Sequence, residues 1–217
     1  MATRRVLTRA ESQARTREDL LDAAEQLFFA DGYHATSIAA IAAEAGRTIG
    51  ALYSNFDNKE ALCVEVIQRG LVRELAKLMP MLVAAPEDME SRLEVLSRWW
   101  ARSSTDTALL ILGAEYLIIV MRDTAQRDDT ANMIRRVIES GRVLLEDFLP
   151  VSIPPNDPLT ESAVRAIFAT GAGLILGSAG ESITADESAQ LLAETIRLWM
   201  RRLLEQAAAV SVAGETA

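Results

Sequence analysis

Helical periodicity runs through almost the whole chain and limits the folds that it can adopt. From Thr16 onward, apolar residues recur every three or four positions, and no stretch alternates apolar and polar residues as a surface strand does. The pattern therefore predicts an all-α fold of about nine helices. The expected helices cover residues 17–31, 37–45, 48–56, 59–79, 87–103, 106–124, 127–149, 159–180 and 186–209.

Capping residues mark the ends of the first helices. Thr16 is a suitable N-cap with Asp19 three residues later, and Gly32 supplies a stop. Thr36 is expected to cap a second helix that ends at Gly46, and Thr48 to cap a third. Two short helices joined by a turn that contains glycine are typical of a helix-turn-helix.

Charge divides the chain into a basic arm and an acidic remainder. The net charge is -9, yet residues 1–17 carry five Arg against Glu11, which gives +4 there and leaves -13 for the rest. We expect four parts: a flexible basic arm at 1–15, a helix-turn-helix head at 16–62, a larger helical body at 63–210 and a disordered tail at 211–217.

The composition excludes several kinds of site. One Cys and one His leave no disulfide framework and no metal centre built from clustered soft ligands. Cys63 lies in an apolar helical pattern that favours an inert core thiol, with a redox sensor as the alternative. His34 is expected to be solvated or capping. The apolar segments 108–121 and 166–180 are shorter than the roughly 18 residues that a bilayer requires, so we expect buried helices there and no membrane span.

The segment from Thr16 to Leu62 resembles the N-terminal domain of the TetR family of bacterial transcriptional regulators. The resemblance rests on the runs A-x-x-L-F-x-x-x-G-Y-x-x-T-S, I-A-x-x-A-G and G-A-L-Y-x-x-F-x-x-K-E-A-L, in that order. It implies double-stranded operator DNA as a partner, a small-molecule effector, a homodimer and no cofactor. The rest of the chain resembles the family only in helical layout and size.

A helix-turn-helix places its second helix in the major groove, while flanking residues contact phosphates. Tyr53 and Lys59 are therefore expected to bind phosphates, and Arg47 and Asn55 to read guanine and adenine. Leu52 and Phe56 are expected to face the core of the head. The complete set of expected DNA-binding residues is Arg4, Arg5, Thr36, Arg47, Thr48, Ile49, Gly50, Ala51, Tyr53, Ser54, Asn55 and Lys59, with Arg9 of the arm beside them.

Small and apolar residues of the last two helices are expected to form the dimer interface. Positions 169, 173 and 177 carry Ala or Gly every four residues, which allows close helix packing, and the last helix adds an apolar stripe. The predicted interface residues are Ala169, Gly173, Gly177, Leu192, Ile196, Trp199 and Leu203. Packing within a single chain is the alternative.

The body carries candidate effector-binding residues at Trp99, Trp100, Arg102, Glu115, Tyr116, Met121 and Met133. Large apolar side chains among helices suit a hydrophobic or aromatic ligand, although the same spacing is typical of plain core. Glu115 is unusual because it interrupts an apolar helix and needs a partner. Arg102, Arg122, Arg165 or the ligand itself is a candidate.

The resulting prediction is a cytoplasmic, dimeric, ligand-responsive regulator, most often a repressor in this family, that binds a palindromic operator. The alternative is an all-α small-molecule-binding protein or enzyme whose DNA-binding head is vestigial. No catalytic residue is assigned, since the sequence has no Ser/His/Asp, Cys/His or paired-carboxylate arrangement at a recognisable spacing. A structural DNA-binding protein would require a more basic surface than -9 allows.

Overall fold

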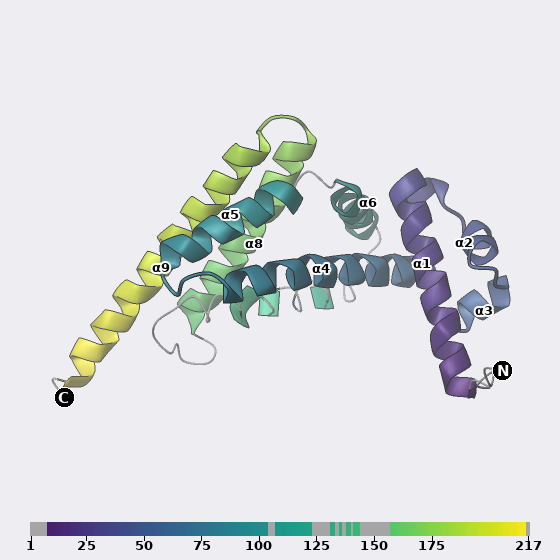
Figure 1. The fold of residues 1–217 in the computed structure, drawn as a ribbon, viewed down its shortest axis with the longest axis horizontal. Helices are drawn as coiled ribbons and strands as arrows, with labels where there is room; N and C mark the ends of the chain where they lie inside the picture. The colour runs from purple at the N-terminus through teal and green to yellow at the C-terminus, as the bar shows by residue number, and fades with distance from the viewer. Residues whose placement is uncertain are drawn as a thin grey trace. The chain divides into compact units, whose positions relative to one another are not determined.

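The computed structural model describes residues 8–103, 107–122, 131–132, 135, 138–139, 141–143 and 157–215, with the backbone alone at 120–122 and 210–215. All regular structure in these ranges is helical, as the sequence predicts, and no strand occurs among them (Figure 1). The helices are α1 (Arg9–Ala35), α2 (Ile38–Glu44), α3 (Ile49–Tyr53), α4 (Lys59–Val83), α5 (Met89–Ser103), α6 (Ala108–Arg122), α8 (Pro158–Ala179) and α9 (Ala185–Glu215).

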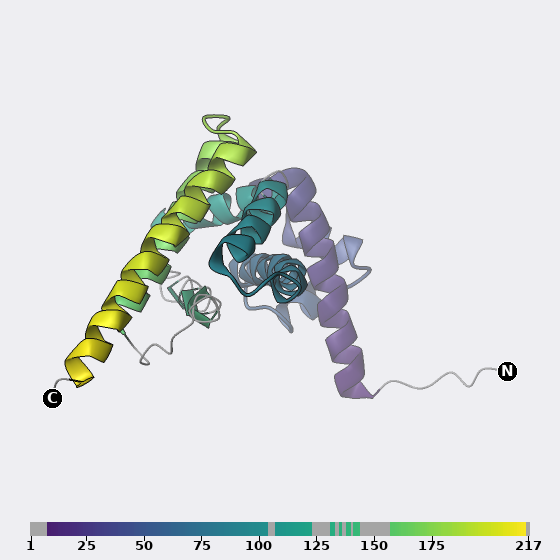
Figure 2. The same ribbon diagram turned by 60° about the vertical axis from the view of Figure 1, so that its left-hand side comes forward.

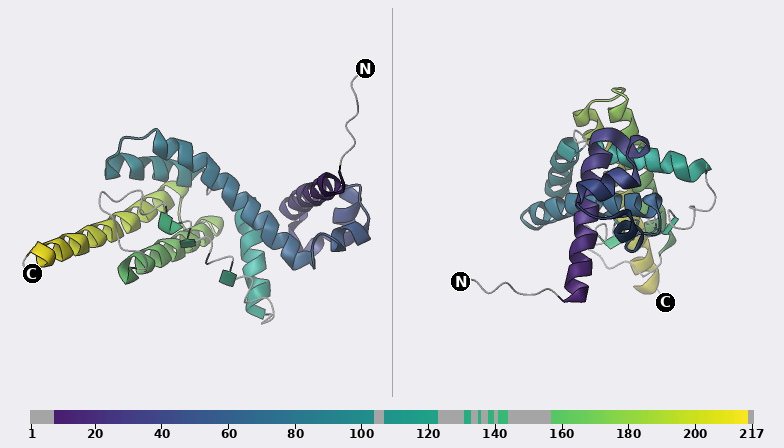
Figure 3. Two further views of the ribbon diagram at one scale, coloured as in Figure 1. Left: turned by 90° about the horizontal axis from the view of Figure 1, so that it is seen from below. Right: turned by 90° about the vertical axis from the view of Figure 1, so that its right-hand side faces the viewer.

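The chain forms two compact units. Unit 1 comprises residues 1–73 and 108–130, and unit 2 comprises residues 74–107 and 131–217. The helix α4 is continuous (Figure 3). Its residues up to Arg73 belong to unit 1, and those from Glu74 onward belong to unit 2. The sequence analysis placed α6 in the body, whereas the structure groups it with the head.

Unit 1 has an apolar core to which α6 contributes. Leu20 and Phe28 of α1, Ile41 of α2 and Leu52 of α3 are at most 2% exposed. Leu112 and Tyr116 of α6 are each 1% exposed, and α6 packs against α1. Burial of these large side chains favours packing of α6 against the head, although its sequence lies far from the other helices of this unit.

The first helix begins earlier than expected. Thr8, rather than Thr16, is its N-cap, and Thr8 and Glu11 form a capping box. Thr16 lies inside the helix, where its hydroxyl donates to the carbonyl of Ser12 at 3.0 Å. The expected stop at Gly32 is present, because this residue has φ +82° and interrupts the helical backbone.

Two other helices are longer than expected. The helix α4 continues past Pro80 to Val83, where the sequence analysis ended it at Met79. The helix α9 continues to Glu215, into the segment that the sequence analysis expected to be disordered from residue 211. Three consecutive alanines at 207–209 favour helix there. The expected helix 127–149 lies mostly outside the described residues, and those of its positions that are described are helical.

Unit 2 is built around α5, α8 and α9. The helix α9 packs against both of the others (Figure 2). The core of unit 2 contains Leu93 of α5, Val164 and Leu174 of α8, and residues of α9. A smaller cluster joins Leu78 and Leu82 of α4 to α5. Asp157 caps α8 by accepting the backbone N–H of Thr160 at 2.7 Å.

The helix α8 is unusually apolar. With 22 residues, it is long and apolar enough to cross a membrane by length and composition. The sequence analysis counted only residues 166–180 as apolar, and that estimate of the length is too short. Only 22% of its most apolar window is buried. Its buried side chains nevertheless belong to the core that α8 shares with α5 and α9.

Candidate nucleic-acid interface

Side-chain caps and one glycine set the geometry of the two short helices of the head. Ser37 caps α2 by accepting the N–H of Ala40 at 3.0 Å, and Thr48 caps α3 by accepting the N–H of Ala51 at 3.1 Å. Gly46, with φ +62°, makes the turn between them. The expected cap of α2 at Thr36 is wrong, since the neighbouring Ser37 takes that role.

One face of α3 is open to solvent. Tyr53 is 55% exposed and Ile49 is 46% exposed, whereas Leu52 is fully buried and Phe56 is 4% exposed. The buried pair confirms the predicted core face and fixes which side of α3 points outward. The exposed residues among the predicted readers are Thr48, Ile49, Gly50, Tyr53 and Ser54, and Ala51 is half-buried.

Three predicted DNA-binding side chains make contacts within the head. Thr36 is 4% exposed, and its hydroxyl donates to the carbonyl of Gly32 at 2.8 Å. Asn55 donates from its amide nitrogen to the carbonyl of Ala51 at 2.8 Å. Ser54 donates its hydroxyl to the carbonyl of Gly50 at 2.8 Å, although Ser54 itself remains exposed. Hydrogen bonds of this kind occupy donors that the sequence analysis assigned to contacts with DNA.

The two predicted cationic contacts are also engaged internally. The guanidinium of Arg47 forms an ion pair with Asp19 of α1. The ammonium of Lys59 donates to the carbonyl of Tyr33 and lies 4.0 Å from the centre of the Tyr33 ring. Burial lowers the pKa of Lys59, while the nearby carboxylates of Glu60 and Glu115 favour its charged form.

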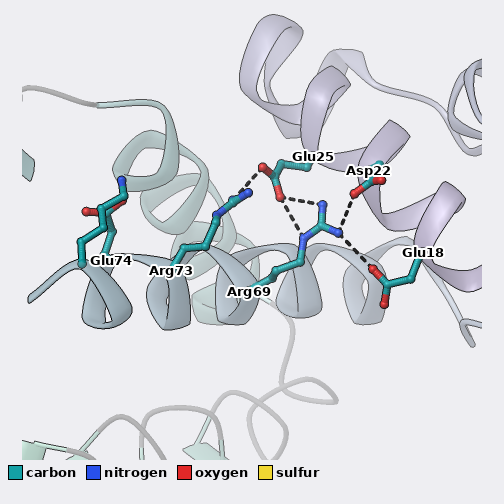
Figure 4. A network of polar contacts seen from close by, with 7 residues as sticks. Glu18, Asp22, Glu25, Arg69, Arg73 and Glu74 are labelled. Carbon is teal, nitrogen blue, oxygen red and sulfur yellow. Dashed lines mark hydrogen bonds and ion pairs between the residues drawn. The ribbon is translucent and has the colours of Figure 1, made fainter. Parts of the chain in front are cut away.

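An ion-pair network joins α1 to α4 within unit 1 (Figure 4). Arg69 contacts Asp22 and Glu25 at 2.7 Å and Glu18 at 3.5 Å, and Glu25 also binds Arg73 at 2.6 Å. Burial alone would lower the pKa of Arg69, but the bonds to Glu25 and Asp22 outweigh it and raise the pKa. The network fixes α1 against the helix that follows the helix-turn-helix.

The sequence analysis missed this network, although a signal for it exists. Acidic residues at positions 18, 22 and 25 lie on one face of a helix, and Arg69 and Arg73 are spaced by one turn. Matching faces of opposite charge indicate two helices that pack together. A second missed pair is Arg17 with Glu65, and the Arg17 guanidinium also lies 4.7 Å from the centre of the Phe56 ring.

The arm is described only from Thr8. Arg4 and Arg5 lie outside the described residues, and Arg9 is the first residue of α1. Residues 9–15 are therefore helical rather than a flexible arm.

The predicted effector-binding residues belong to both units. Trp99, Trp100 and the exposed Arg102 lie on α5 in unit 2, whereas Glu115 and Tyr116 lie on α6 in unit 1. Glu115 accepts the backbone N–H of Tyr33 at 2.7 Å, and Arg165 pairs with Glu161. Arg122 and Met121 have no described side chains, and Met133 lies outside the described residues.

The two tryptophans of unit 2 differ in their polar contacts. The indole N–H of Trp100 donates to the buried hydroxyl of Ser188 at 2.8 Å. The buried indole N–H of Trp99 has no hydrogen-bond partner in the part of the chain that the structure describes. A buried donor without a partner costs free energy, so Trp99 offers an unused donor.

The predicted dimer residues divide by exposure. Ala169 and Gly173 are exposed, while Leu192, Ile196 and Leu203 are at most 7% exposed and belong to the core of this single chain. Gly177 and Trp199 are half-buried, and a Cβ at Gly177 would lie 2.9 Å from Ile183. Among the side chains that the structure describes in α8 and α9, the exposed large apolar ones are Phe168, Leu176, Leu191 and Leu198. The sequence pattern thus identified the apolar stripe of α9 that packs inward.

Cys63 and His34 differ in environment. Cys63 is fully buried, and burial raises the pKa of its thiol to about 12. This favours the inert core thiol over the redox sensor, because the thiolate is the reactive form. His34 is exposed, and its ring packs edge-on against Tyr33 with centroids 5.5 Å apart.

The head is similar in sequence to a known family of bacterial regulatory proteins. A family model for bacterial regulatory proteins of the tetR family matches residues 20–66. The HTH-type transcriptional repressor KstR2 of Rhodococcus jostii (strain RHA1) is 39% identical over 80 residues, which are 37% of this chain and 39% of KstR2. The HTH-type transcriptional repressor ComR of Escherichia coli (strain K12) is 28% identical over 190 residues, which are 84% of this chain and 88% of ComR.

A crystal structure of a protein from Saccharomonospora viridis in complex with choline has a similar fold. Its TM-score is 0.62 at 16% identity, and the match covers 85% of this chain and 96% of that protein. The present chain therefore spans less than half of KstR2, but most of ComR and of the S. viridis protein.

Proposed function

We propose that this chain is a transcriptional regulator of the TetR family, a homodimeric repressor that binds a palindromic operator and is released by a small effector. The observation that supports DNA binding is the solvent-exposed face of α3. Thr48, Ile49, Gly50, Tyr53 and Ser54 are exposed on a helix held in place by buried Leu52 and Phe56. Repression is proposed because KstR2 and ComR are both repressors. A regulator of bacterial genes works in the cytoplasm.

Tyr53 is the proposed phosphate contact of α3, since it is an exposed tyrosine and the last residue of the reading helix. Ile49 supplies apolar contact with a thymine methyl, and Gly50 allows close approach to the DNA. Arg47 and Lys59 contribute only to the extent that DNA competes with their internal partners. Base reading by one head is therefore narrow, and two heads are required for discrimination.

A second copy of the chain is the proposed partner of α8 and α9. Phe168, Leu176, Leu191 and Leu198 are between 37% and 61% exposed, while Ala169 and Gly173 add small residues that allow helices to approach closely. Apolar side chains in this number on two neighbouring helices are typical of a protein interface. A two-fold axis through this surface would pair the two heads with the two halves of a palindrome.

Trp99 marks the proposed effector site in unit 2. Its ring packs against the cluster of Leu78, Leu82 and Val95, and its buried N–H has no partner in the described part of the chain. An apolar effector that carries one hydrogen-bond acceptor would satisfy this donor. The S. viridis protein binds choline, so a quaternary ammonium is a suitable first probe beside neutral aromatic compounds.

Selection from a library of random duplexes tests the proposed function. The full-length protein is expected to enrich a palindrome with two half-sites, and excess unlabelled palindrome is expected to displace the bound DNA. Enrichment of single half-sites would contradict the dimer. Absence of any enriched sequence would favour the alternative of an all-α small-molecule-binding protein or enzyme with a vestigial head.

The arm has a separate test. Deletion of residues 1–7 removes Arg4 and Arg5 but leaves the Thr8 cap of α1 in place. We expect weaker operator binding and a slope of log K against log salt that is shallower by about two, one for each lost phosphate contact. Replacement of the exposed Arg201 by Gln, far along α9, is the matched control and should leave the slope unchanged. An unchanged slope after the deletion would show that the arm does not contact DNA.

A further inference from the structure

Tyr33 is held at four points within unit 1. Its backbone N–H donates to Glu115 of α6 at 2.7 Å, and its carbonyl accepts the ammonium of Lys59. Its ring lies under the same ammonium, and its hydroxyl donates to Glu60 at 2.7 Å. The side chain is 4% exposed and stacks on Phe28.

The position of Tyr33 in the chain gives these contacts their importance. Tyr33 directly follows Gly32, where the helical backbone of α1 is interrupted, and it precedes the Ser37 cap of α2 by four residues. The backbone at 32–36 therefore sets the direction in which α2, the turn and α3 leave α1. A change in the direction of this backbone would therefore change the orientation of every exposed residue of α3.

Glu115 lies against this backbone at close range. A Cβ at Gly32 would be 3.1 Å from Oε1 of Glu115, which is tight even for van der Waals contact. With φ +82°, Gly32 also adopts a conformation that side chains disfavour. Glycine at this position thus allows both the turn and the approach of the carboxylate.

The environment of Glu115 indicates a specific contact. It is the single acidic residue of α6, a helix that buries Leu112 and Tyr116. A carboxylate on such a helix loses hydration and needs compensation. The Tyr33 N–H supplies a donor, and the charged Lys59 is close enough to Glu115 to be favoured by it. The bond also satisfies a backbone N–H at the point where the helical hydrogen bonding of α1 is interrupted.

We propose that Glu115 is a positioning residue for DNA binding: by accepting the Tyr33 N–H from α6, it holds the 32–36 backbone in the direction that presents α3. The residue lies outside residues 20–66, the segment that the family model matches. The inference rests on the proposed DNA-binding function and adds that the geometry of the reading helix depends on α6. Glu115 itself does not contact DNA.

Three substitutions separate the acceptor, its reach and its charge. Glu115→Gln keeps an acceptor oxygen at the same distance but removes the charge. Glu115→Leu removes the acceptor. Glu115→Asp keeps the charge but shortens the side chain by one methylene, so it gives a milder version of the same loss if the Leu variant does not fold. Leu117→Gln is the matched control, because it alters an exposed position of the same helix.

Two measurements are made on each full-length variant: amide hydrogen exchange at Tyr33, and affinity for the palindrome enriched by the wild-type protein at several salt concentrations. Glu115→Leu is expected to reduce the protection of the Tyr33 amide and the operator affinity by about tenfold each, the scale of one unpaired part-buried N–H. The slope of log K against log salt stays unchanged, because no phosphate contact is lost. Glu115→Gln and Leu117→Gln stay within about threefold of wild type in both, well inside that loss.

Several results would overturn the proposal. Loss of Tyr33 protection without loss of operator affinity would show that the bond has no role in DNA binding. Unchanged protection and affinity in Glu115→Leu would show that the contact between Glu115 and the Tyr33 N–H contributes to neither. A Gln variant that binds the operator as weakly as the Leu variant would show that the charge of Glu115, rather than its acceptor oxygen, is required. A slope shallower by about one would show that the substitution removes a cation–phosphate contact, such as one made by Lys59, rather than acting through the direction of the backbone. Failure of the wild-type protein to enrich any DNA would instead defeat the proposed function and leave the exchange result interpretable.

Discussion

Arg47 illustrates how an internal partner changes the role that a sequence motif suggests. The sequence analysis assigned it to guanine, but its guanidinium is paired with Asp19, and both side chains are about one third exposed. An ion pair of this exposure is worth only about 0 to 1 kcal/mol, so DNA phosphates compete with Asp19 on similar terms. Asp19 therefore limits how much of the Arg47 charge is available to DNA.

Replacement of Asp19 by Asn tests this competition. We expect binding to a random 30-base-pair duplex to become tighter by about two- to tenfold, and the slope of log K against log salt to become steeper by up to about one, as Arg47 gains a phosphate. Fluorescence anisotropy at several salt concentrations measures both quantities. In an Arg47→Gln background, the Asn substitution should have no effect. Equal binding by the wild-type and Asp19→Asn proteins would show that Arg47 stays a structural residue.

Sequence reasoning did not identify the polar side chains that bond to the backbone of the head, and the reason is physical. Whether Asn55 faces DNA depends on where α3 ends, and α3 ends at Tyr53, which lets the Asn55 amide bond the Ala51 carbonyl. Leu52 and Phe56 were predictable because apolar side chains at helical spacing leave little choice of face. A hydrogen bond from a side chain to the backbone one turn earlier leaves no comparable periodic pattern in the sequence.

At the scale of helices, most positions were predictable and several ends were not. Thr8 with Glu11 and Thr16 with Asp19 are both acceptable starts for α1, since each places an acid three residues after a threonine. The earlier pair forms the capping box, whereas Asp19 binds Arg47. Arg47 lies in the turn between α2 and α3, so a local pattern around Thr16 does not contain the partner that Asp19 binds. The grouping of α6 with the head is non-local for the same reason.

The N-cap of α8 is a prediction at this scale. The carboxylate of Asp157 accepts hydrogen bonds from the backbone N–H and the hydroxyl of Thr160. It also accepts one from the side-chain amide of Gln206, whose nitrogen lies 2.8 Å away. Replacement by Ala should lower the free energy of unfolding by about 1 kcal/mol, and replacement by Asn should lower it by less, because Asn is also a good cap. Urea denaturation measures the difference. A loss as large in the Asn variant would mean that charge, rather than capping, stabilises this helix end.

The same cap should depend on pH. Burial raises the pKa of Asp157, but the bonds from Thr160 and Gln206 outweigh it, and the pKa is lower in the folded protein. The stabilisation is therefore complete above the unfolded value of about 3.9 and is lost as the pH falls through the lower, folded value. The difference between wild type and Asp157→Ala should shrink as the pH is lowered below about 4. An identical difference at pH 7 and pH 3 would exclude the carboxylate as its source.

At the scale of the whole molecule, the exposed apolar residues of α8 and α9 support the proposed dimer. Leu176 is 61% exposed and Leu198 is 54% exposed, beside small residues at Ala169 and Gly173. The sequence analysis found the two helices but chose Leu192, Ile196 and Leu203, which the protomer buries itself. Periodicity identifies an apolar stripe, but it does not tell which of two stripes is buried within the chain.

Charge at this surface tests the dimer and its link to DNA. Leu176→Arg and Leu198→Arg should each convert the protein to a monomer in sedimentation experiments, since a buried charge without a partner costs several kcal/mol at an interface. Both positions are exposed in the protomer, so far-ultraviolet circular dichroism should stay that of a folded helical protein. Operator affinity should fall at least about tenfold, because one head binds one half-site.

Val83→Arg is the matched control for these substitutions. Val83 is apolar and 81% exposed, but it lies at the end of α4, so it should leave the dimer and the operator affinity unchanged. Wild-type protein should also unfold at a temperature that rises with its concentration, whereas the two Arg variants should not. A variant that remains dimeric would exclude the α8 and α9 surface as the interface. A monomer that binds the palindrome as tightly as wild type would exclude two-fold symmetry as the source of specificity.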